Sequence, residues 1–82
     1  MQILFKDEAL KKLQKINKSD INKIKRKIEL LKINPLAGKP LHGEFAGTFT
    51  LRAWPLRIIY TFNPKLQQVI IITIDYRGSV YK

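Results

Sequence analysis

Arg52 and Arg57 flank the four residues AWPL, and this spacing is the first indication of a site. The segment AWPL can turn the chain between two strands, and a tight turn would place both arginines opposite or diagonal to each other on one face of a sheet. Like charges opposite each other destabilise a sheet, so such a pair usually binds an anion or pairs with a carboxylate of the protein. Glu44 and Asp75 are the candidate carboxylates. Because Arg57 alternates with isoleucines in LRIIY, we expect it on the face away from the helices.

The last eight residues, DYRGSVYK, follow the apolar run VIIITI. This run leads into a polar cluster with two phenols and two cations: Asp75, Tyr76, Arg77, Tyr81 and Lys82. We expect Arg77 near the two turn-flanking arginines, with Tyr81 folded back over them. Arginine suits bidentate contact with phosphate, and a phenol ring can stack on an exposed base. We therefore predict that the tail is part of a phosphate-binding site or, alternatively, that its tyrosine is a hydrophobic plug that covers the core.

His42 lies in the segment PLAGKPLHGEFAG, a loop rich in glycine and proline. A lone loop histidine is usually exposed and uninvolved, but it can serve as general acid or base if the loop reaches the arginines. The chain has no cysteine and a single histidine, which excludes thiolate and multi-histidine metal sites. It also lacks a glycine-rich phosphate loop and a nucleophile elbow. We expect neither a metal nor a cofactor.

The charge balance favours a polyanionic partner. Lysine and arginine number 16 against 6 aspartates and glutamates, which gives a formal net charge of +10. Such a surface attracts nucleic acid or another polyanion, although it also serves solubility alone. The sequence shows no signal-peptide pattern and no apolar run of membrane-spanning length. We therefore expect a soluble, cytoplasmic domain with no membrane partner.

Two amphipathic helices are predicted after a short strand at Gln2–Phe5. Asp7 can cap the first helix, whose apolar residues recur at helical spacing: Leu10, Leu13 and Ile16. Ser19 can cap the second helix, whose apolar stripe consists of Ile21, Ile24, Ile28 and Leu31. This helix should end at Asn34, because a residue before proline is pushed out of the α region. We interpret the lysine-rich faces of both helices primarily as ordinary solvent-exposed faces and secondarily as contacts for nucleic acid.

Three strand-like runs follow the loop at 35–47: TFTLRAW, LRIIYTF and QVIIITI. The first alternates polar and apolar residues, and NPKLQ forms a turn between the second and third. The third is apolar on both faces, which suits the middle of a sheet. The prediction is one α+β domain over residues 1–82, in which an N-terminal strand and a helical hairpin pack on an antiparallel sheet.

The ordered set NPLAGKPLHGEFAGTFTLRAWPLRIIY and IITIDYRGSVY resembles the RelE/ParE superfamily of toxin–antitoxin toxins. The most specific parts are the Asn-Pro after the second helix, the G-x-P-L-x-G loop, LR-x₄-RIIY and the terminal R-x₂-VY. The resemblance implies a ribosome-dependent endoribonuclease that cleaves mRNA in the A site by attack of the 2′-hydroxyl, with mRNA, ribosomal RNA and an acidic antitoxin as partners. It also implies that Arg57, Arg77 and Tyr81 are catalytic, and that RNA contacts come from Arg52, Tyr76, Lys82 and His42.

The sequence departs from the RelE pattern at several positions. Thr48 and Thr50 stand where RelE has lysines, and Tyr76 stands where many relatives have a histidine. The general base therefore remains open between His42, Tyr76 and Tyr81, with Tyr81 favoured. The alternatives are a ParE-like inhibitor of DNA gyrase, which shares the fold without needing catalytic residues, and a catalytically inactive homologue.

Overall fold

The computed structural model describes residues 1–76, and the predicted site residues Arg77, Tyr81 and Lys82 lie outside this range. Along the chain the elements are β1 (Gln2–Phe5), α1 (Asp7–Gln14), α2 (Lys18–Ile33), β2 (Lys39–Pro40), a 3₁₀ helix (Gly43–Phe45), β3 (Phe49–Ala53), β4 (Leu56–Asn63) and β5 (Gln68–Tyr76). The predicted α+β class, with a helical hairpin and an antiparallel meander, is confirmed.

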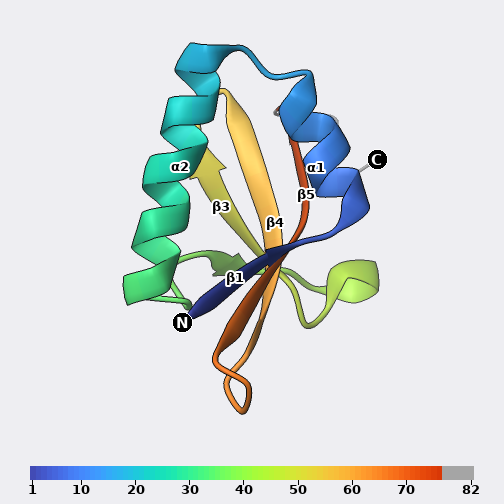
Figure 1. Ribbon diagram of the computed structural model, residues 1–82. Coiled ribbons are helices and arrows are strands. Elements are labelled where there is room, and N and C mark those ends of the chain that lie inside the picture. The colour runs from blue at the N-terminus through green and yellow to red at the C-terminus, as the bar shows by residue number, and fades with distance from the viewer. Residues whose placement is uncertain (77–82) are drawn as a thin grey trace.

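The strands form one sheet in the order β1-β5-β4-β3-β2. β1 pairs with β5 in parallel, and the other neighbours are antiparallel. The hairpin α1–α2 supplies the crossover that a parallel pair requires, since such strands cannot be joined by a tight turn. β5 is thus an interior strand, which explains its apolar sequence. Figure 1 shows α1 beside β5 and α2 beside β3.

Both predicted helix N-caps are wrong by one or two residues. The N-cap of α1 is Lys6, and Asp7 instead lies in the first turn, where its carboxylate faces the positive end of the helix dipole. The N-cap of α2 is Asn17, whose Oδ1 accepts from the backbone N–H of Asp20 at 2.9 Å. The Ser19 hydroxyl donates to the same Oδ1 at 2.8 Å and caps nothing. The predicted end of α2 at Asn34 is confirmed, with Asn34 as its C-cap.

The core lies on the helix side of the sheet. Ala9 and Ile16 from the α1 region and Ile24 and Leu31 from α2 pack against inward-facing strand residues such as Ile58. Burying side chains of this size stabilises a fold by roughly 1.5–3 kcal/mol each. The other face of β3, β4 and β5 carries charged residues and threonines around the buried Ile59.

Tyr60 fastens the loop after α2 to this core. Its side chain is fully buried, and its hydroxyl donates to the carbonyl of Pro35 at 2.9 Å while accepting from the N–H of Gly38 at 2.8 Å. A β-carbon at Gly38 would lie 2.6 Å from the Tyr60 Oη and 2.9 Å from the carbonyl oxygen of Thr50. Glycine is therefore required where the loop crosses the end of the sheet.

Candidate phosphate-binding site

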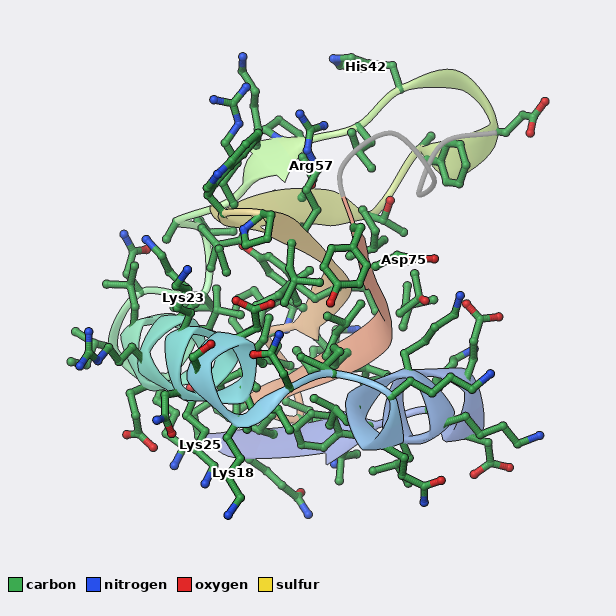
Figure 2. All side chains as sticks on the ribbon, turned by 90° about the horizontal axis from the view of Figure 1, so that it is seen from above. Lys18, Lys23, Lys25, His42, Arg57 and Asp75 are labelled. Atoms are coloured by element: carbon green, nitrogen blue, oxygen red, sulfur yellow. The ribbon has the colours of Figure 1, made fainter. Side chains whose placement is uncertain are left out.

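Three charged residues form a row across β3, β4 and β5. Arg52 pairs with Arg57, and Arg57 pairs with Asp75. Opposite residues of antiparallel strands place their side chains on the same face, so the turn-flanking arginines are neighbours, as their spacing predicted. Figure 2 shows Arg57 projecting from the side of the sheet away from the helices. We call these three residues the arginine row.

The two arginines of the row differ in their surroundings. Arg52 is exposed and makes no hydrogen bond or ion pair with another residue of the range 1–76. Arg57 is half-buried between flanking strands. The strand register makes the two arginines neighbours on one face, and each guanidinium group carries a planar fork of N–H donors that matches the oxygens of a phosphate.

Asp75, the predicted candidate carboxylate, is oriented by α1. Its Oδ2 accepts from the Lys12 ammonium at 2.7 Å, and its Oδ1 accepts from the N–H of Tyr76 at 2.8 Å. β1 pairs only with residues Gln68 to Ile71 of β5, so the strand edge beside Asp75 is open to the long Lys12 side chain. The hydrogen bond from Lys12 to Asp75, and then the Asp75 charge, raise the pKa of Lys12 above its ordinary 10.5.

A second row lies next to the arginine row on the same face. It consists of Thr50, Ile59 and Thr73, which are partners in the strand register. Ile59 is buried there, and within the described residues the buried hydroxyls of Thr50 and Thr73 have no hydrogen-bond partner. Buried hydroxyls without a partner are uncommon in proteins, and these two lie beside the arginines. The face therefore carries unused donors as well as cations.

His42 lies at the edge of this face. It directly precedes the 3₁₀ helix, and its side chain is exposed. In Figure 2, His42 and Arg57 both lie on the side of the molecule away from the helices. Glu44, in the same short helix, is exposed as well. The structure thus brings His42 to the same side as the arginine row.

Tyr76 belongs to a different face. It pairs with Leu56, whose side chain is buried in the core, so its register points it toward the helix side. There it lines a hollow of about 150 Å³ together with Lys12 and Lys15 of the α1 region. Arg52 and Arg57 are therefore together, while Tyr76 is not beside them.

Sequence reasoning missed two features. The pairing of Lys12 with Asp75 joins residues 63 positions apart, and no local pattern indicates it. The exposure of Trp54, a residue in the turn between β3 and β4 that is 60% exposed, is not indicated by any local pattern either. Within residues 1–76 no cluster of three or more histidine, aspartate or glutamate side chains could hold a metal ion. No helix of that range is long and apolar enough to cross a membrane.

Known proteins resemble this chain in sequence and in fold. The family described as "ParE toxin of type II toxin-antitoxin system, parDE" matches residues 3–81. Toxin RelG of Mycobacterium tuberculosis is 38% identical over 45 residues, a match that spans 55% of this chain and only about half (52%) of that relative.

Solved structures match over nearly the full chain. The toxin–antitoxin complex RelBE2 from Mycobacterium tuberculosis contains a chain that is 30% identical, with a TM-score of 0.81 and coverage of 93% of this chain and 96% of that one. An archaeal RelE–RelB complex from Pyrococcus horikoshii contains one with the same TM-score of 0.81 at 21% identity, covering 95% and 96%, and this match supports the fold alone. With a family match over almost its whole length, the chain belongs to the RelE/ParE superfamily of type II toxin–antitoxin toxins.

Proposed function

We propose that this protein is a ribosome-dependent endoribonuclease that cleaves mRNA in the ribosomal A site. The observation that carries the proposal is the pairing of Arg52 with Arg57 on the face away from the helices. Two like charges held opposite each other weaken the sheet, and an anion that contacts the exposed Arg52 beside Arg57 would offset this cost. The scissile phosphate of an RNA is such an anion, and the relatives carrying RelE names support this choice.

The reaction needs no cofactor. The 2′-hydroxyl oxygen attacks the adjacent phosphorus, the bond from phosphorus to the 5′-oxygen breaks, and the products are a 2′,3′-cyclic phosphate and a 5′-hydroxyl. Arg57 stabilises the negative charge that develops on the phosphoryl oxygens, and Arg52 holds the neighbouring backbone. One group must take the proton of the 2′-hydroxyl, and another must protonate the leaving 5′-oxygen.

The acid–base groups of the proposal come from the family resemblance. Tyr81 remains the favoured candidate, with Arg77 as a further phosphate contact and Lys82 as an RNA contact. All three lie outside the described residues. His42 is the candidate on the described part of the same side, whereas Tyr76 would act from the α1 side of β5.

The experiment is cleavage of mRNA on programmed ribosomes, followed by mapping of the new 5′ ends. We expect cuts phased with the codons. Replacing Arg57 by Ala should lower the single-turnover rate by about a hundredfold or more, as loss of a charge-stabilising donor does in other enzymes. Arg57→Lys should recover only part of the rate, since an ammonium cannot make the bidentate contact.

The matched control is Lys25→Ala, which removes the same charge from the far side of α2 (Figure 2). It should leave the cleavage rate within about twofold and thermal unfolding nearly unchanged, because an exposed charge contributes little to stability. Because Arg57 is half-buried, circular dichroism should be used to show that Arg57→Ala remains folded. Wild-type cleavage by Arg57→Ala would overturn the role of the arginine row.

A second candidate function is inhibition of DNA gyrase, which the description of the matching family favours. A gyrase inhibitor binds a protein and needs no cleavage chemistry. Supercoiling by purified gyrase in the presence of the protein tests this directly. Inhibited supercoiling with intact messages would favour the ParE-like function, and absence of both activities would identify an inactive homologue.

A further inference from the structure

Trp54 is an exposed residue and does not belong to the core. It lies at the turn between β3 and β4, and 60% of its surface is exposed. A large aromatic side chain gains most from burial, and an exposed indole also offers a flat apolar surface to a ligand. It is also the only tryptophan of the chain.

A hollow of about 370 Å³ opens beside this indole. One wall is a single stripe of α2, formed by residues at positions i, i+3, i+4 and i+7: Lys23, Arg26, Lys27 and Leu30. The other wall is the turn residue Trp54 with Ala53 below it. We call this the Trp54 hollow. Its volume is within the range of about 300–1,000 Å³ typical of small-ligand sites.

The charge of the hollow selects an anion. Its lining contains Lys23, Arg26 and Lys27 and no carboxylate. The Lys23 ammonium lies 3.6 Å from Asp20 Oδ1 at the edge of the stripe, which is a long contact. Lys23 and Lys27 are four residues apart, and like charges at this spacing weaken a helix. Lys23 thus serves the helix through Asp20, whereas the spacing of Lys23 and Lys27 gives the helix no further benefit.

We propose that the Trp54 hollow binds single-stranded RNA, with an unpaired base stacked on the indole and adjacent phosphates held by Lys23, Arg26 and Lys27. Cations that track a backbone beside an aromatic platform are the usual means of binding an unstacked strand. The turn that carries Trp54 directly joins Arg52 to Arg57. The hollow lies on the α2 side of this turn and the arginine row lies on the face away from the helices, so a strand that contacts both must pass around the turn.

The inference rests on the proposed function in the choice of RNA as the anion, but its test does not require cleavage. The probe is a short single-stranded RNA titrated into the Arg57→Ala variant, whose indole emission reports on Trp54 alone. Saturable quenching is expected. An oligonucleotide of the same length without bases should bind more weakly and leave the emission unchanged, because it offers phosphates but nothing to stack.

The matched variants compare two faces of α2. Lys23 and Lys27 line the hollow, whereas Lys18 and Lys25 lie on the side of α2 opposite Lys23 in Figure 2. Lys23→Gln with Lys27→Gln should weaken RNA binding about tenfold and lower the slope of log K against log salt by about 1 to 2. Lys18→Gln with Lys25→Gln changes the net charge equally and should weaken binding less than about twofold.

Trp54→Leu, followed by anisotropy of a labelled RNA, should lose about fivefold or more in affinity, the effect expected for one stacked base. Three results would overturn the proposal: equal losses in both lysine pairs, quenching by the oligonucleotide without bases, or stronger quenching by an acidic peptide than by RNA. The last would assign the hollow to an acidic protein partner. If RNA quenches the emission but the protein makes no codon-phased cuts, the proposal of RNA binding in the hollow stands and the proposal of nuclease activity is rejected.

Discussion

At the scale of single residues, the direction of one carboxylate matters for the charge of the arginine row. Asp75 is next to Arg57 in the strand register, and its Oδ2 accepts a hydrogen bond from Lys12 of α1. The Lys12 ammonium therefore adds a positive charge beside the carboxylate of the row. Lys12 is a positioning residue in our proposal, because it holds Asp75 and touches no substrate.

The ion pair between Lys12 and Asp75 should contribute to stability in a pH-dependent way. Because the folded state raises the pKa of Lys12, this contribution is fully present below the ordinary value of 10.5 and is lost as pH rises through the folded-state pKa. We expect wild type to be more stable than Lys12→Met by a constant amount from neutral pH to about pH 10, with the difference shrinking above that. Urea unfolding at a series of pH values measures it.

Lys32→Met is the control for this experiment, since Lys32 pairs with Glu29 on an exposed face of α2. Exposed pairs contribute little, so its stability should follow that of wild type at every pH. If the difference between wild type and Lys12→Met persisted above the lysine range, it would come from packing of the side-chain stem and the ion pair would not be its cause.

At the scale of elements, Tyr60 connects β4 to the loop that leads into β2. Its hydroxyl serves both the Pro35 carbonyl and the Gly38 N–H, and burial raises the pKa of the phenol, so it remains a neutral donor at physiological pH. This loop continues to His42 and the 3₁₀ helix at the edge of the candidate site. The hydroxyl therefore fixes the point from which the His42 segment starts.

Tyr60→Phe should lower the free energy of unfolding by about 1–3 kcal/mol, because it leaves two backbone groups without their partner while keeping the ring. The ring retains its stacking on Phe49, with centroids 5.3 Å apart. Thr61→Val removes an exposed hydrogen bond to Gly47 from the same strand and should cost much less. Equal losses in the two variants would show that the Tyr60 hydroxyl has no special role in the loop.

The elements were predictable from local patterns, and the contacts between them were not. The position of Arg52 opposite Arg57 on one face of the sheet was predicted correctly, because a short turn fixes the register of the two strands. The N-cap of α2 was missed because Asn17, Ser19 and Asp20 are all good capping residues, and the backbone geometry decides between them. The strand partner of Tyr76 depends on a register shift between Ile59 and Tyr60, and no pattern of residues in the sequence indicates this shift.

At the scale of the whole molecule, a net charge of +10 coexists with exposed apolar residues. Ile33 at the end of α2 is 85% exposed and Leu36 in the following turn is 60% exposed, beside the partly exposed Leu30. We propose an acidic antitoxin as the partner, because the matching chain from Mycobacterium tuberculosis was solved in a toxin–antitoxin complex. Such a partner can gain affinity from charge, from these apolar residues or from both, and the two contributions respond differently to salt.

If charge dominates, binding of the antitoxin should weaken steadily as ionic strength rises. Attraction between opposite charges speeds the encounter and is screened beyond a Debye length of about 8 Å at physiological salt. The association rate should therefore fall by about tenfold or more between low and high salt, while the dissociation rate changes less. Surface plasmon resonance with wild type, and with Ile33→Ser as the apolar variant, separates the two. If the affinity is independent of salt concentration but is strongly reduced in Ile33→Ser, the apolar end of α2 provides most of the binding energy for the partner.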